Sequence, residues 1–98
     1  MNALIQISNV QIHPVIQNQS LVAFASCEIN DSFYLGNIAI HTAPNNPLGY
    51  RLVFPTKALS SGKQIPCFYP YKREIEEVVT SAIVKKYIEL MDNFNHVE

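Results

Sequence analysis

Residues 49–70, with the sequence GYRLVFPTKALSSGKQIPCFYP, decide how the chain is organised. The segment opens with a short strand of alternating apolar residues, which Pro55 ends. An exposed polar loop is predicted over residues 56–64. A second short strand is predicted over residues 65–69, at a sheet edge because it contains a proline. Pro70 stands just before a long helical pattern, so the segment predicts two short strands that lead into one helix.

The chain beyond Pro70 has the apolar spacing of one amphipathic helix, which we predict over residues 72–91. Its apolar stripe consists of Ile75, Val78, Val79, Ala82, Ile83, Tyr87, Leu90 and Met91. Acidic residues lie in the early turns and two lysines lie later, as the helix dipole favours. At 1.5 Å per residue the helix is roughly 30 Å long, and we expect it to pack on a sheet.

Two strands joined by a short polar turn predict a β-hairpin upstream. The first strand, residues 21–29, has one face of small apolar residues: Leu21, Ala23, Ala25, Cys27 and Ile29. This face is narrow enough for a helix to lie across it. In the second strand, residues 33–41, alternation places Tyr34 on the same face as Ile38 and Ile40. The opposite face of that strand is assigned Phe33, Leu35 and Ala39.

The N-terminal segment predicts a further strand that a bulge interrupts. Apolar residues alternate on both sides of Ser8 and Asn9 but in opposite phases, which indicates a β-bulge at these two residues. Pro14 places the end of this strand at a sheet edge. Residues 42–48 contain two prolines and two asparagines and predict a loop. The patterns together predict an α+β fold, with a hairpin-rich antiparallel sheet of about four to five strands and one C-terminal helix.

Length and composition indicate one domain over residues 1–91 and a frayed tail over residues 92–98. The 98-residue chain is 48% apolar and has a formal charge of −1. That charge argues against strong nonspecific attraction to nucleic acid, although it allows a local basic patch. We expect no membrane segment, because neither a positive leader nor an apolar run of roughly 20 residues is visible. Cys27 and Cys67 lack Cys-x-x-Cys spacing, which fits a reducing cytoplasm.

The residue types that usually carry catalysis or bind metals form no constellation in this sequence. His13, His41 and His96 have no partner at metal-ligand spacing. Cys27 falls on a strand face predicted to be core, where packing explains it better than a nucleophilic role. Three widely spaced glycines do not match the usual phosphate-loop fingerprints. We therefore expect no catalytic residue, no metal site and no cofactor, and a protein that is not an enzyme.

The basic residues, in contrast, are concentrated in one part of the chain. Five of the seven positive charges fall within 23 residues: Arg51, Lys57, Lys63, Lys72 and Arg73. Such a segment could follow a phosphate backbone, and the interleaved Tyr69 and Tyr71 could stack on bases. The alternative is an ordinary solvated surface on which lysines protect short edge strands from pairing.

Three stretches of the chain resemble the stage V sporulation protein G (SpoVG) family of bacterial regulators. They are LVAFASCEINDSF at residues 21–33, GYRLVFPTK at residues 49–57, and Pro70 followed by Ala82, Ile83 and Tyr87. The resemblance runs from about Ile5 to Tyr87. Its specificity lies in the occurrence of these elements together and in order.

This resemblance implies a small antiparallel sheet with a C-terminal helix, assembled as a homodimer that shares strands. It also implies a role in septation and sporulation, DNA or RNA binding by several members, and no enzymatic activity. The chain departs from the family where Arg or Lys is usual, since those places read Gln11, His13, Ala39, Ala58 and Glu76. Lys57 remains. The apolar positions match, but fewer charges are available to hold phosphate.

Two functions remain open from the sequence. One is a cytoplasmic, dimeric regulator that binds DNA or RNA through Arg51, Lys57, Lys63, Lys72 and Arg73. The alternative is a dimeric regulator of division or sporulation that binds proteins and has lost nucleic-acid affinity. The resemblance favours the first function, whereas the near-neutral charge favours the second.

Overall fold

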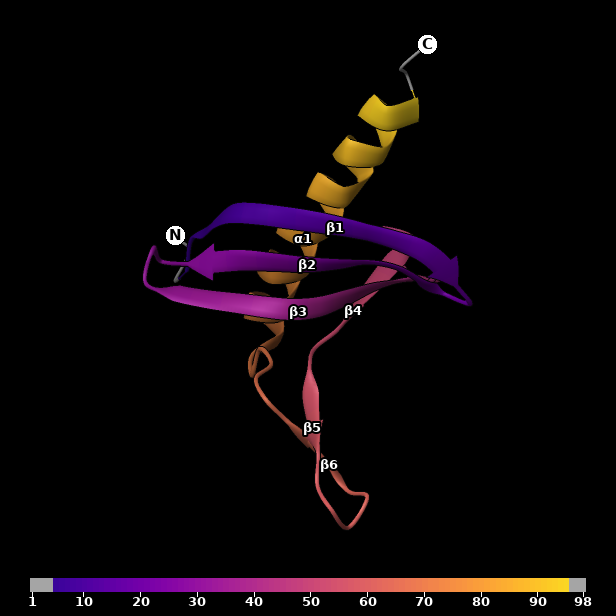
Figure 1. The fold of residues 1–98 in the computed structure, drawn as a ribbon. Helices are drawn as coiled ribbons and strands as arrows, with labels where there is room; N and C mark the ends of the chain where they lie inside the picture. The colour runs from indigo at the N-terminus through magenta and orange to yellow at the C-terminus, as the bar shows by residue number, and fades with distance from the viewer. Residues whose placement is uncertain (1–4, 96–98) are drawn as a thin grey trace.

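The computed structural model describes residues 5–95 and shows a sheet with one helix across its back (Figure 1). The four-stranded antiparallel sheet has the order β1-β2-β3-β4 and consists of β1 (Ile7–Asn18), β2 (Leu21–Ile29), β3 (Phe33–Thr42) and β4 (Tyr50–Val53). A second, two-stranded sheet consists of β5 (Thr56–Ala58) and β6 (Gln64–Pro66). The helix α1 (Arg73–Asn95) follows. The predicted α+β fold is confirmed.

The core lies between α1 and one face of the four-stranded sheet. Its buried residues are Val22, Ala23, Ala25, Cys27, Ile38, Ile40, Val79, Ile83 and Tyr87. The small residues of β2 let the helix approach the sheet closely, as the sequence indicated. The helix begins one residue later than predicted and continues to Asn95, so the first residues of the expected frayed tail are helical. No helix within residues 5–95 is long and apolar enough to cross a membrane.

The sheet register shifts at four places, and the shifts near Asn9 and Asn37 bear on the predicted strand faces. The register of β1 shifts between Ser8 and Gln11, and Asn9 has a φ of 50°, which confirms the bulge predicted there. A second bulge lies in β3, because two residues, Gly36 and Asn37, lie opposite the single residue Ser26 of β2. No change of phase in the apolar pattern marks this extra residue in the sequence.

The bulge in β3 corrects the predicted faces of that strand. Asn37 has a φ of 59°, a left-handed conformation that asparagine tolerates better than most residues. The inserted residue flips the alternation, so Leu35 packs against the core together with Ile38. The prediction that Tyr34 shares a face with Ile38 and Ile40 is therefore wrong, and Tyr34 points to the face that α1 does not cover.

The second sheet forms an arm, residues 56–66, that extends away from the rest of the domain (Figure 1). Thr56 pairs with Pro66 and Ala58 with Gln64, so the segment predicted as a loop begins with a strand. The predicted strand over residues 65–69 is shifted and ends at Pro66. Every residue of both strands is exposed, and such strands have no buried face to leave an alternating pattern in the sequence.

Candidate nucleic-acid interface

The arm carries two of the five predicted basic residues. Lys57 lies on β5 opposite Ile65, and Lys63 directly precedes β6. The backbone of the tip is closed by a hydrogen bond from the Leu59 N–H to the Lys63 carbonyl at 2.8 Å. Both lysines are exposed. The arm therefore presents two ammonium groups on a narrow support, where a phosphate backbone could reach them.

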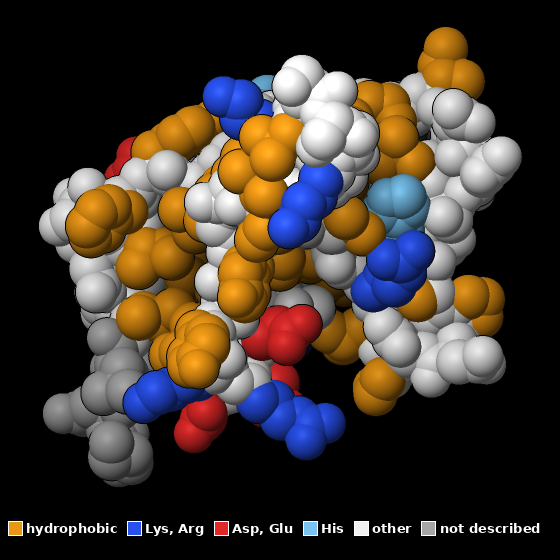
Figure 2. All heavy atoms as spheres, turned by 90° about the horizontal axis from the view of Figure 1, so that it is seen from below, with side chains coloured by type: hydrophobic (Ala, Val, Ile, Leu, Met, Phe, Trp, Pro, Cys, Tyr) orange, Lys and Arg blue, Asp and Glu red, His pale blue; other side chains and the backbone are white. Residues whose placement is uncertain are grey.

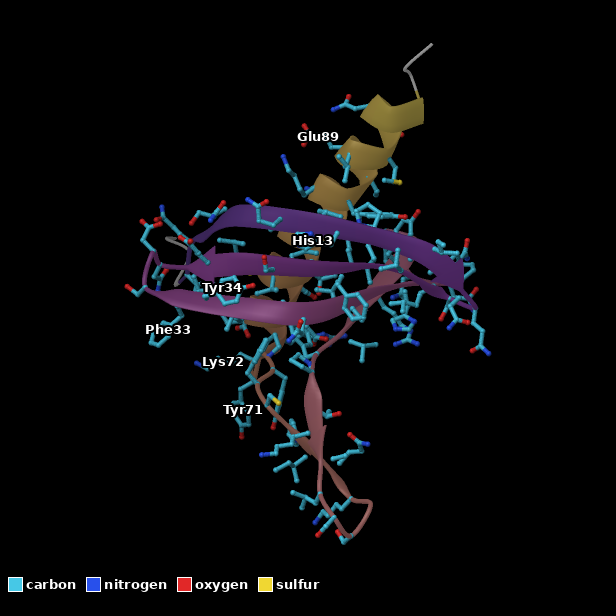
Figure 3. The ribbon with its side chains drawn as sticks, viewed as in Figure 1. His13, Phe33, Tyr34, Tyr71, Lys72 and Glu89 are labelled. Carbon is cyan, nitrogen blue, oxygen red and sulfur yellow. The ribbon has the colours of Figure 1, made fainter. Side chains whose placement is uncertain are left out.

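The start of α1 carries two more of the five predicted basic residues, Lys72 and Arg73. The Lys72 carbonyl accepts the Ile75 and Glu76 N–H groups at 3.1 and 3.0 Å, so Lys72 is the residue at which the helix begins to form. Arg73 lies 3.9 Å from Glu77 in an exposed ion pair, which solvent and salt screen. Figure 3 shows the side chains of Tyr71 and Lys72 next to each other in the segment before the helix.

Arg51 is separate from both pairs because it lies in the four-stranded sheet. It is opposite His41, on the face that α1 does not cover. Burial, followed by the positive charge of Arg51, lowers the pKa of His41. The His41 Nδ1 atom is 2.8 Å from the Ser20 hydroxyl. Arg51 thus belongs to the open face of the sheet and not to the arm.

The structure does not gather the five predicted residues into one basic patch. In Figure 2, which looks at the arm side of the molecule, Lys and Arg side chains stand in separate groups with hydrophobic and acidic side chains between them. The basic residues predicted to form one surface along residues 51–73 therefore lie in three separate places. Lys57 and Lys63 are on the arm, Lys72 and Arg73 are at the start of α1, and Arg51 is on the sheet. The five residues are close in sequence, which suggested that they form one surface. The break of the strand at Pro55 was the only sequence feature to indicate that the arm leaves the domain.

A hollow of about 520 Å³ lies between β4, the loop before it and the first turns of α1. Arg51 and Arg73 contribute to its lining, but so do Glu76 and Glu77, which makes it a poor phosphate site. Its apolar lining comes from Leu48 and from β4. The hollow therefore combines charged residues of both signs with apolar residues.

The free edge of β4 borders this hollow. The Ala43 N–H donates to the Gly49 carbonyl at 2.8 Å, and bonded pairs alternate along an antiparallel ladder. The backbone groups of Tyr50 and Leu52 consequently point away from β3. The Tyr50 carbonyl accepts a hydrogen bond from Asn46 Nδ2 at 3.2 Å. An extended peptide could pair with the remaining groups.

The open face of the four-stranded sheet holds residues that the sequence did not indicate as a site. One row crosses all four strands and consists of His13, Phe24, Ala39 and Val53. Tyr34 lies on the same face and is 73% exposed, among the more exposed large side chains in the described part of the chain. The signal that could have found this site is the pair of aromatic residues Phe24 and Tyr34 in neighbouring strands, but the bulge in β3 concealed their common face.

Within residues 5–95, no three His, Cys, Asp or Glu residues lie close enough together to hold a metal ion. Burial raises the pKa of the Cys27 thiol, which favours the protonated form in the core. Cys67 is exposed beyond β6. The described structure thus places the two thiols in different environments.

A model of the SpoVG family matches residues 5–89, which is most of the chain. The chain belongs to the SpoVG family. No curated protein matches the sequence significantly. Three of the positions at which the SpoVG resemblance implies basic residues, namely Gln11, His13 and Ala39, lie on the open face of the sheet. Three of the five departures that the resemblance implies thus lie on one surface.

Proposed function

We propose that the protein is a cytoplasmic SpoVG-like regulator of septation and sporulation, not an enzyme, that acts as a homodimer and binds DNA or RNA. The observation that carries the proposal is the arm with its surroundings. Lys57 and Lys63 are exposed on the arm, and Lys72 is exposed next to the exposed ring of Tyr71 in the segment before α1, which also contains the exposed Tyr69. Cations that contact phosphate and rings that stack on bases are the two components of nonspecific single-strand binding.

The arm also supports the proposed homodimer. A two-stranded sheet of three-residue strands is marginally stable by itself in water. Leu59 and Ile65 in the arm are 39% and 37% exposed, so both retain apolar surface that a second copy could cover. A symmetric dimer would also double the number of cations available to one nucleic acid.

Fluorescence anisotropy of labelled, mixed-sequence DNA and RNA across a salt series tests nucleic-acid binding. We expect log K to fall with log[salt], at about −0.9 per phosphate contacted in duplex DNA. Lys57→Glu should weaken binding and reduce this slope by about one contact for each arm engaged. Lys85→Glu is the matched control, since Lys85 is exposed on α1 outside the basic segment. Negligible binding at low salt would overturn the proposal.

One observation favours the alternative, a regulator that binds proteins. The hollow beside β4 combines a free strand edge with an apolar lining and two opposite pairs of charges. Peptides bind such edges by adding a strand, with the backbone supplying affinity and alternate side chains supplying specificity. If the salt series shows no nucleic-acid binding, Leu52→Lys should abolish the retained protein interaction, whereas the arm variant Lys57→Glu should not.

A further inference from the structure

We propose that the open face of the four-stranded sheet is a stacking platform for a single-stranded nucleic acid. This inference rests on the proposed nucleic-acid binding and specifies both the surface and the form of the ligand. It places base contacts on β2 and β3, outside the basic segment from Arg51 to Arg73. The arm and the helix start would supply only phosphate contacts.

The face is accessible because α1 packs on the other side of the sheet, as Figure 1 shows. No described element covers the row from His13 to Val53. Phe24, in the second strand of this row, is 37% exposed, and the small residue Ala39 beside it is buried. The centre of the face is therefore a shallow apolar surface with an aromatic ring next to a small residue.

Tyr34 is held flat on this face by a glycine. A Cβ atom at Gly36 would lie 2.8 Å from the Tyr34 hydroxyl oxygen and 2.9 Å from its Cε2 atom, so the ring lies directly over the glycine backbone. Figure 3 shows the Tyr34 side chain along the β3 ribbon. One side of the ring is therefore against the strand, and the high exposure of the residue means that the other side is open to a base.

The charges near this face favour a single strand over a duplex. Arg51 is the one Lys or Arg that the strand register places on the face within residues 5–95, with His13 and His41 as further polar rings. Duplex binding depends mainly on phosphate contacts, which this face is poorly equipped to make. A single strand exposes the faces of its bases, and stacking on aromatic side chains tolerates any sequence. A four-stranded antiparallel sheet with aromatic residues on its open face suits that mode of binding.

The test compares a labelled 12-nucleotide single strand, as DNA and as RNA, with its matched duplex by anisotropy. We expect Tyr34→Ala to weaken single-strand binding about tenfold to hundredfold, the effect of losing one stacked base. Tyr34→Phe should bind like the wild type because it keeps the ring. Gly36→Ala should weaken binding while Tyr34 is still present, because the new methyl group must lift the ring from the strand.

Phe33→Ala is the matched control. Phe33 adjoins Tyr34, is similarly exposed at 68%, and lies on the opposite face of β3, as its pairing with Ile29 shows. In Figure 3 its side chain points away from the sheet. We expect this variant to bind as the wild type does. Circular dichroism and sedimentation of every variant would show that fold and oligomeric state are retained.

Three results would overturn the inference, and they differ in what they leave intact. If Tyr34→Ala binds single strands normally while Lys57→Glu does not, nucleic acid binds at the arm and the proposed function stands. If Tyr34→Ala changes the oligomeric state, the open face is an interface between copies of the chain. If the wild type binds neither single strand nor duplex, the proposed function fails together with this inference.

Discussion

The sheet–helix body and the arm are made of similar residues but hold their structure by different means. In the body, Ile38, Ile40 and Ile83 are fully buried between α1 and the sheet. In the arm, Ile65 is 37% exposed, and the cross-strand bond from Thr56 Oγ1 to Gln64 Oε1, at 2.7 Å, is in solvent. The body is therefore stabilised by the burial of apolar side chains within one chain. The arm depends on its local backbone hydrogen bonds and on contacts with a second molecule.

The contact between the two regions is aromatic. Phe54 and Phe68 pack edge to face at the base of the arm, with ring centroids 6.0 Å apart. The Cys67 N–H donates to the Pro55 carbonyl at 2.9 Å, which closes the same base. The direction of the arm is therefore fixed at its base, while its far end is free to contact a second molecule.

The largest expected difference between the regions is in thiol reactivity. Cys67 is exposed and should react with a thiol reagent at once, whereas Cys27 is buried, with a pKa that burial raises. Cys27 should react only when the body unfolds, at least roughly a thousandfold more slowly for a domain of ordinary stability. Reaction kinetics of wild type and Cys67→Ser measure this. Slow reaction of Cys67 that becomes faster on dilution would show instead that a second copy covers the arm.

Replacing one isoleucine in the body and one in the arm should change the free energy of unfolding by different amounts. Ile83→Ala removes a fully buried side chain and should lower the free energy of unfolding by about 2–5 kcal/mol. Ile65→Ala should change it by no more than about 0.5 kcal/mol, because the side chain is partly in solvent. Urea unfolding followed by circular dichroism gives both values. Equal losses would mean that the arm is buried in the folded protein in solution.

Two glycines with positive φ should give a smaller difference. Gly49, with a φ of 82°, precedes β4 in the body, and Gly62, with a φ of 91°, lies at the arm tip. Alanine is strained by about 1 kcal/mol in this conformation. Gly49→Ala should therefore lower the urea midpoint of the domain, whereas Gly62→Ala should affect only hydrogen exchange of the arm amides. A lower midpoint for Gly62→Ala would show that both regions unfold as one unit.

The smallest expected effect is the pH dependence that His41 gives the body. Burial and Arg51 hold its folded-state pKa below the ordinary value of 6.5, so the unfolded chain takes up a proton first as the pH falls. The contribution to stability is complete above about pH 6.5 and is lost as the pH falls through the folded-state pKa. His41→Gln should flatten the stability profile in this window. An unchanged slope would assign the titration to other groups.

Much of the body could be predicted because its residues repeat with the period of the element they form. The stripe through Val79 and Ile83 predicted α1, and alternation through Ala23 and Ala25 predicted the core face of β2. The bulge at Asn9 was predictable for the same reason, since apolar residues on both sides reveal the change of phase. The family match over residues 5–89 confirmed the resemblance that these stretches carry.

The candidate site was less predictable because its residues are on the surface, where no periodic pattern of apolar residues is required. Lys57 and Lys63 share the arm, but their separation from Arg51 depends on the turn of the chain at Pro55. The face of Tyr34 depends on one inserted residue at Asn37, which no apolar neighbour marks. Exposed residues need not be apolar at a fixed spacing, so the sequence does not indicate which of them are neighbours in the folded protein.

The order of β1 to β4 and α1, and much of the core, follow from the sequence alone, because burying apolar side chains against a regular backbone requires a fixed spacing. The pairing of β5 with β6 into an arm is visible only in the folded protein, as is the row that consists of His13, Phe24, Ala39 and Val53. Those arrangements depend on the register between strands distant in sequence. A register is a property of paired strands, and one bulge changes every face beyond it.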